Sequence, residues 1–160
     1  MKKRGSEGMS VWGEPETDVE RQQESRKETQ VLEPSLKGVM LCKKVYTDHM
    51  GRNTYAGEFR TIHVGDVPAV CSGVSIVTKW GDGQGGCFRQ EIKIVDPENS
   101  LEIFNSAELE TRFSLDNIYH EHVVAGQISG LFLPKAGRYR IEVYLDGEMK
   151  GKTYFNVINK

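Results

Sequence analysis

From Lys37 onward the sequence alternates between apolar and polar residues, and this two-residue period is the feature that most restricts how the chain can fold. In the segment 88–94 the alternate positions carry Phe88, Gln90, Ile92 and Ile94, and the residues between them are charged. Successive side chains of a β-strand point to opposite faces, whereas an amphipathic helix needs apolar residues three and four apart. The period therefore predicts strands with one buried face and one face in water.

Eight segments show this period, and residues typical of turns separate them: 38–46, 54–63, 70–80, 87–95, 101–113, 118–132, 138–145 and 148–158. In the segment 70–80 we expect Val70 to share the buried face with Trp80, and in the segment 118–132 we expect Phe132 to share it with Val124. Antiparallel strands with one wet face pack as two layers. The prediction is an all-β fold, a two-layer antiparallel β-sandwich of about eight strands.

The register of the last hairpin can be predicted from the side chains that must share a face. A two-residue loop at Asp146-Gly147 would place Lys150 opposite the apolar Val143. A three-residue loop, 145–147, instead pairs Val143 with Met149 and places Gly147 in the left-handed region. We therefore expect the three-residue loop.

The composition changes near residue 36. Residues 1–35 are rich in charged and amide side chains, poor in apolar ones, and contain no β-rich run. Such a segment buries too little apolar surface to offset the entropy cost of ordering it. We predict a disordered charged tail over 1–35 and a β-sandwich domain over 36–160.

The charge balance excludes some classes of partner. The 21 Lys and Arg residues against 23 Asp and Glu give a net charge of -2, without the cationic excess of a nucleic-acid-binding protein. No apolar run approaches the roughly 20 residues that span a bilayer, and no apolar segment follows the basic start as in a signal peptide. The expectation is a cytoplasmic protein with no membrane contact.

Three stretches of the sequence resemble a known family. The first runs from Met40 through the turn at 48–52 to Phe59, and the second is Val95-Asp96-Pro97. The third comprises the segments 130–139 and 146–148, Gly-Leu-Phe-Leu-Pro-Lys-Ala-Gly-Arg-Tyr and Asp-Gly-Glu. Over about residues 38–158 the chain resembles an uncharacterised bacterial family of small immunoglobulin-like (Ig-like) β-sandwich domains. The resemblance implies an Ig-like fold with no assigned activity and no catalytic residues to carry over.

A metal site is the alternative from the enzyme class, and it rests on His120 and His122. Residues two apart on a strand project to the same side and can share a metal ion. A zinc site needs three or four ligands, and no spacing assigns a third among His63, Asp66 and His49. The two imidazoles are otherwise expected at the rim of the sandwich with hydrogen-bond partners.

Aromatic residues suggest carbohydrate binding as a second alternative. Trp80 stands beside the glycine-rich loop 81–86, and Tyr119 and Tyr144 occupy wet-face positions where their rings could stack on a sugar or a protein. The glycine-rich loop precedes a strand, unlike a phosphate-binding loop, which opens a helix. Cys42, Cys71 and Cys87 have no metal-binding spacing and are expected to be free thiols.

These observations favour a non-enzymatic binding module. No coherent acid–base pair, nucleophile, cofactor loop or basic patch is visible in the strand sequences. We expect no cofactor, and another protein as the partner. The oligomeric state stays open.

Overall fold

The computed structural model describes residues 30–96, 98–106 and 111–160. Residues 31–160 form one compact unit, which is the β-domain described below. The disordered tail predicted for 1–35 lies, over residues 1–29, outside the described residues. No helix in the described part of the chain is long and apolar enough to cross a membrane.

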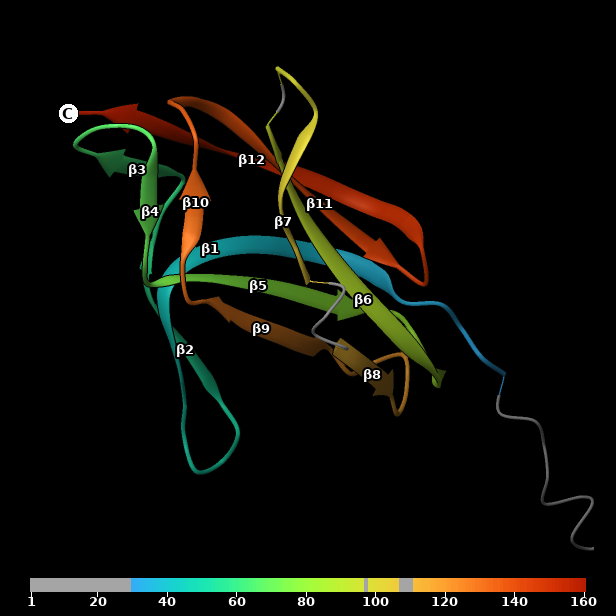
Figure 1. The fold of residues 1–160 in the computed structure, drawn as a ribbon. Coiled ribbons are helices and arrows are strands. Elements are labelled where there is room, and N and C mark those ends of the chain that lie inside the picture. The colour runs from blue at the N-terminus through green and yellow to red at the C-terminus, as the bar shows by residue number, and fades with distance from the viewer. Residues whose placement is uncertain (1–29, 97, 107–110) are drawn as a thin grey trace, which may run out of the picture. The chain divides into compact units, whose positions relative to one another are not determined.

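The β-domain is built of strands, as the alternation predicts, and Figure 1 shows their arrangement. Their bounds are β1 Ser35–Thr47, β2 Asn53–Glu58, β3 Thr61–Val64, β4 Ala69–Cys71, β5 Val74–Gly81, β6 Gly85–Asp96, β7 Leu101–Asn105, β8 Thr111–Leu115, β9 His122–Ile128, β10 Leu131–Leu133, β11 Gly137–Leu145 and β12 Glu148–Asn159. One sheet has the order β2-β1-β5-β9 and the other has the order β3-β12-β11-β6-β7, with β8 also paired to β6. β4 and β10 form a separate two-stranded ribbon. The all-β sandwich is confirmed.

The strand order is that of an immunoglobulin-like sandwich. Strands β1-β5-β9 follow the order A-B-E of that fold, and β6-β11-β12 follow the order C-F-G. Tyr139, near the start of β11, donates its hydroxyl proton to the backbone oxygen of Lys135 at 2.7 Å. This contact is the tyrosine corner expected near the start of strand F. The pairing is antiparallel throughout, except that β3 runs parallel to β12.

The alternation identifies most of the core correctly. Phe88, Gln90, Ile92 and Ile94 are all buried, as are the alternate residues of β11 from Tyr139 to Leu145. Trp80 is fully buried, and its Nε1 donates to Gln90 Oε1 at 2.7 Å, which explains why a glutamine occupies a core position. The core fills the space between the two sheets.

Expected long strands are broken where the chain changes sheet. The segment 54–63 divides into β2 and β3, the segment 70–80 into β4 and β5, and the segment 118–132 contains β9 and β10. Gly73, with a φ of 72°, makes the second break. A bend resets the alternation, so the predicted burial of Val70 and Phe132 is wrong: these side chains are 70% and 49% exposed.

The predicted register of the β11–β12 hairpin is also wrong. Asp146 and Gly147 form a two-residue turn with φ values of 48° and 87°, and Leu145 pairs with Glu148. A register shift then places Val143 opposite Gly151. A β-bulge at Lys150 therefore keeps the lysine charge away from the core. The sequence predicts the same separation, but by a three-residue loop. The left-handed conformation of Gly147 is as expected.

The β-domain begins before the expected boundary at residue 36, which lies inside β1. The backbone of Leu32 exchanges two hydrogen bonds with that of Gln84, at 2.8 and 3.0 Å. Glu33 forms an ion pair with Lys150, and Lys37 forms one with Asp82. Residues 31–37, which we call the N-terminal strap, are thus held against the β5–β6 turn and β12.

Candidate binding surface

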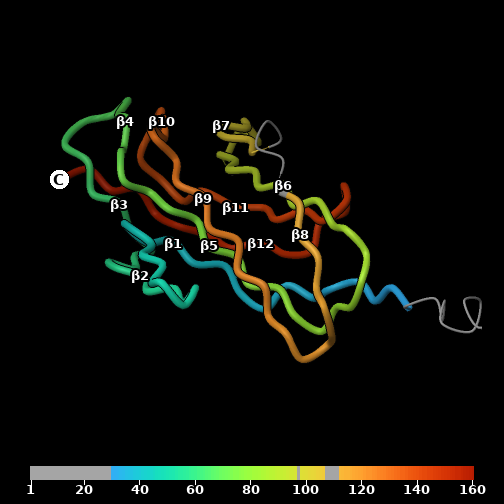
Figure 2. The backbone as a smooth tube through the Cα atoms, turned by 90° about the horizontal axis from the view of Figure 1, so that it is seen from below, coloured from blue at the N-terminus to red at the C-terminus, as the bar shows by residue number. Residues whose placement is uncertain are grey.

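A groove opens at the end of the β-domain where β3 and β4 lie. Its volume is about 700 Å³. The walls come from the end of β2, from β3 and from the turn between β4 and β5, and the residues are Lys43, 57–59, 61–63 and 71–74. Figures 1 and 2 both draw β3 and β4 at this end, near the C-terminus. We call this feature the end groove.

The lining of the end groove combines apolar and polar side chains. Ile62 and Val74 are buried and Phe59 and Thr61 are half-buried. The polar residues Lys43, Glu58, His63 and Ser72 are exposed. Gly57 has a φ of 68°, and a Cβ there would lie 3.0 Å from the Lys43 side chain. The aliphatic part of the Lys43 side chain therefore packs directly against the backbone of Gly57, where a larger residue would collide with it. Such apolar pockets with a few polar groups are typical of binding sites.

The Cys71 thiol lines the groove and is a chemically reactive type of side chain, but its surroundings do not lower its pKa. Burial raises its pKa, and its Sγ donates to the oxygen of Ser72 at 3.7 Å. A nucleophilic cysteine needs a lowered pKa or an adjacent base. The thiol stays protonated near neutral pH and acts as a small apolar side chain.

An exposed apolar pair lies on the β4–β10 ribbon next to the groove. Val70 and Phe132 are directly opposite each other in the antiparallel register. Their neighbours Leu131 and Leu133 are buried, which leaves Val70 and Phe132 on the outer face of the ribbon. We call them the ribbon pair.

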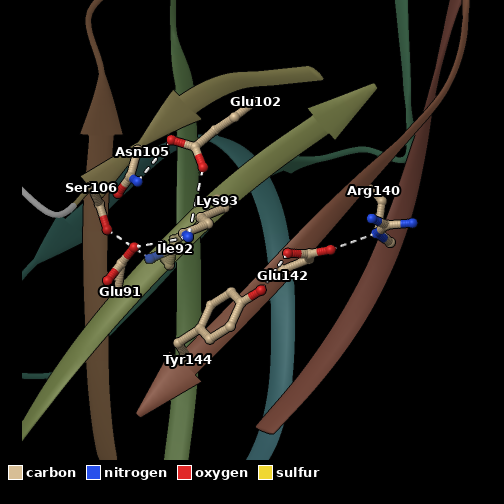
Figure 3. Close-up of polar contacts among 9 residues, drawn as sticks. All are labelled: Glu91, Ile92, Lys93, Glu102, Asn105, Ser106, Arg140, Glu142 and Tyr144. Carbon is tan, nitrogen blue, oxygen red and sulfur yellow. Dashed lines mark hydrogen bonds and ion pairs between the residues drawn. The ribbon is translucent and has the colours of Figure 1, made fainter. Parts of the chain in front are cut away.

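The third surface feature is a network of polar side chains on the outer face of the second sheet, and Figure 3 shows it. Glu142 is only 6% exposed and accepts hydrogen bonds from Arg140 Nε at 2.7 Å and from the Tyr144 hydroxyl at 2.6 Å. Burial alone would raise the pKa of Glu142, but these two donors more than offset it and the pKa is lowered. The same hydrogen bond raises the pKa of Tyr144 to about 12.

Lys93 completes this network. Its Nζ lies 3.5 Å from Glu91, 3.7 Å from Glu102 and 5.0 Å from the centre of the Tyr144 ring. Each carboxylate of the network is therefore satisfied by a neighbour on the same face. This arrangement holds the side chains of neighbouring strands together on one face of the sheet, and the lowered pKa of Glu142 keeps that carboxylate ionised.

The two histidines proposed as metal ligands lie in different settings. His120 precedes β9 in an exposed turn, where it lies 3.3 Å from Asn117 Nδ2 and 3.8 Å from Asp116. His122 begins β9 and stacks on Phe113, with 4.9 Å between the ring centres. Burial lowers the pKa of His122. Over residues 30–96, 98–106 and 111–160, no cluster of three or more metal-binding side chains is found.

The three aromatic residues proposed for ligand stacking are also dispersed. Trp80 is fully buried and offers no ring face to a ligand. Tyr144 is tied to Glu142, and Tyr119 is 87% exposed in the turn before β9. The structure does not assemble them into one platform. The three cysteines are free, as expected, and Cys42 is buried while Cys87 is exposed.

The sequence analysis missed the end groove and the ribbon pair. The one signal that could have located them was the pair of short apolar runs at 69–71 and 131–133, the first followed by Ser72 and Gly73 and the second preceded by Gly130. Those glycines mark the bends at which the alternation restarts.

The β-domain matches a known protein family over nearly its whole length. Residues 37–158 match the Family of unknown function (DUF6941). The chain belongs to this family. The match covers the β-domain almost completely, and it excludes the whole of the charged segment 1–35. The family resemblance seen in the sequence is thereby confirmed, and it assigns no activity.

Two solved structures are similar in fold. One is an immunoglobulin-like protein from Pseudomonas aeruginosa, with 12% identity and a TM-score of 0.40 over 79% of this chain and 97% of that chain. The other is the alkylpurine DNA glycosylase AlkC from Pseudomonas fluorescens bound to DNA with an abasic site analog, with 11% identity and a TM-score of 0.39. It aligns over 81% of this chain, which spans only 30% of the glycosylase chain. No match was found among curated proteins.

Proposed function

We propose that this protein is a non-enzymatic binding module whose partner is another protein. The observation that carries the proposal is the ribbon pair, Val70 and Phe132, exposed on a short ribbon beside the end groove. Burying an exposed apolar side chain contributes about 1.5–3 kcal/mol, so a cross-strand aromatic and β-branched pair can anchor an interface. Protein interfaces have such an apolar centre inside a polar rim.

The ionisable groups support a structural rather than a catalytic reading. Glu142 is held by Arg140 and Tyr144, and Asp96 accepts hydrogen bonds from the Glu98 backbone at 2.9 Å and lies 3.1 Å from Lys135 Nζ. These contacts fix turns and sheet faces. The free cysteines are consistent with a cytoplasmic location, where thiols stay reduced.

Site-specific photocrosslinking in the source cells tests the proposal. A photoreactive phenylalanine analogue replaces Phe132 in one variant and Met149 in a control, because Met149 is similarly exposed on β12. We expect a discrete protein adduct from position 132 that is absent from position 149 and disappears when Val70→Asp is added. Two results would refute the proposal that the ribbon binds a protein: the same adducts from positions 132 and 149, or an adduct from position 132 that persists when Val70→Asp is added.

A further inference from the structure

β3 presents an open backbone edge to the end groove. It is the terminal strand of its sheet within the described residues, paired on one side to β12. The N–H groups of Asn156 and Lys160 donate to the backbone oxygens of Arg60 and Val64, at 2.9 and 2.8 Å. In a parallel ladder the backbone groups alternate between the two sides. Those of Thr61 and His63 therefore point away from β12, and both residues line the groove.

β4 contributes Cys71 to the groove wall, together with the β4–β5 turn, and within the described residues β4 pairs with β10. No proline lies within β3, so this device for protecting a strand edge is absent there. The groove is thus bordered by one strand edge, that of β3.

The groove volume matches a short strand. One residue of a sheet occupies about 160 Å³, from a rise of about 3.3 Å, a strand spacing of about 4.8 Å and a layer spacing of about 10 Å. A volume of about 700 Å³ then holds about four residues of extended chain. β3 itself has 4 residues and β4 has 3, so the space fits a strand of their length.

The lining indicates the chemistry of such a strand. Phe59, Ile62 and Val74 form an apolar floor, and the formal charges of Lys43 and Glu58 on the wall cancel. A strand without net charge complements this balanced lining, since a charged one would leave one sign unpaired near apolar surface. Its alternate side chains would point to the floor and must be apolar.

We propose that the end groove takes an extended, uncharged segment of a partner protein as an added strand on the β3 edge. The segment carries apolar side chains at alternate positions and pairs with the backbone of Thr61 and His63. This inference rests on the proposed protein-binding function and specifies how the partner is held. Main-chain hydrogen bonds supply affinity in this mode, and the floor selects the side chains.

Selection of random linear peptides displayed on phage against the full-length protein is the test. We expect enriched peptides with apolar residues at every second position over about four residues. Hydrogen exchange then measures the amides of Thr61 and His63, which should become protected when an enriched synthetic peptide is added. No enrichment, or protection confined to the ribbon pair, would overturn the inference.

Two backbone changes separate strand addition from side-chain contact. His63→Pro removes an N–H that points to the groove and leaves the β3–β12 ladder intact, and His63→Ala is the matched control that keeps the N–H. We expect His63→Pro to weaken peptide binding by about tenfold or more and His63→Ala to leave it nearly unchanged. Equal affinities for the two variants would contradict strand addition.

Methylation of the peptide backbone keeps the test independent of whether His63→Pro folds. Methyl groups on alternate peptide nitrogens of one parity should abolish binding, and those of the other parity should be tolerated. Loss at both parities, or at neither, refutes the strand.

Other occupants of the groove give different results. Trp12 is an aromatic residue of the N-terminal segment 1–35. Protection of Thr61 and His63 in the free protein that vanishes in Trp12→Ala would identify this segment of the same chain as the occupant, and protection that rises with protein concentration would identify a second copy. Either result overturns the inference of a partner segment. Peptides whose binding is weakened by changes at Val70 and Phe132 but not by His63→Pro would leave the proposed function standing and remove the added strand.

Discussion

At the residue scale, the stability of the core depends on one polar side chain. The Gln90 Oε1 atom accepts hydrogen bonds from Trp80 Nε1 and from the Thr78 hydroxyl, and all three residues are buried. Removing a shared acceptor leaves buried donors unsatisfied, at about 1–3 kcal/mol each. The Thr78 hydroxyl has an alternative acceptor in the Val124 oxygen at 3.4 Å, so the Trp80 donor bears most of the loss.

We predict that Gln90→Leu lowers the free energy of unfolding by about 2–3 kcal/mol, measured by urea denaturation. The double variant Thr78→Val with Gln90→Leu should be no less stable than Gln90→Leu alone, because it removes a buried hydroxyl that is left with only the longer hydrogen bond to the Val124 oxygen. Greater destabilisation in the double variant would show that Thr78 contributes through contacts other than Gln90.

A second residue-scale prediction concerns acid sensitivity. Burial lowers the pKa of His122 below the ordinary histidine value of 6.5. The unfolded chain then binds the proton more readily than the folded chain, so stability is full above the unfolded pKa and declines as pH falls below it. We expect His122→Phe, which keeps an aromatic ring against Phe113, to lose less stability than the wild type between pH 7 and about 5. An NMR titration that places the His122 pKa above 6.5 would contradict this.

At the scale of elements, the β5–β6 turn and the N-terminal strap fit together through Gly83. A Cβ at Gly83 would lie 2.7 Å from Leu115 Cδ1 and 2.9 Å from the Cα of Pro34, closer than real Cβ contacts. We expect Gly83→Ala to destabilise the protein by about 1–3 kcal/mol, since the backbone of the strap must move.

Gly126 on β9 is the matched control, because nothing lies within 4 Å of its added Cβ. Gly126→Ala should leave the thermal midpoint unchanged or raise it slightly. Similar losses in both alanine variants would indicate a general effect of replacing a strand glycine rather than a packed strap.

The elements also show what the sequence can and cannot predict. The alternation from Phe88 to Ile94 gives the buried face correctly because β6 runs through the core without a bend at these residues. It fails at Val70 and Phe132 because a bend at Gly73 and another near Gly130 restart the period, and the alternation does not show to which sheet the next strand belongs. It fails at the last hairpin because either a bulge or a longer loop can keep Lys150 from lying opposite Val143, and the alternation does not distinguish between them.

The candidate surface shows a further limit. The end groove is made of residues from three parts of the chain, and only the crossing from β2 to β3 and the β4–β5 turn bring them together. The histidine pair looked stronger in the sequence because two residues apart on a strand is a local geometry. Since β9 begins at His122, His120 is outside the strand and the local argument does not apply.

At the scale of the whole molecule, the N-terminal strap determines where the folding unit begins. Residues 31–37 contribute the two backbone hydrogen bonds of Leu32, the Glu33–Lys150 and Lys37–Asp82 ion pairs, and the side chain of Leu36, which lies against Gly151. Exposed ion pairs contribute little, about 0–1 kcal/mol, so the hydrogen bonds and apolar contacts should dominate.

We predict that a protein beginning at Gln30 keeps the thermal midpoint of the full chain, whereas one beginning at Lys37 loses about 2–4 kcal/mol of stability. Differential scanning calorimetry of the three proteins measures the difference, and Leu36→Ala in the full chain isolates the apolar part of it. Because the strap also covers Gly83 and the β5–β6 turn, its removal should increase amide exchange at Gln84 before it affects β11. Equal midpoints for the two truncated proteins would mean that the sandwich is complete without the strap, and that the sequence-based boundary at residue 36 is the better one.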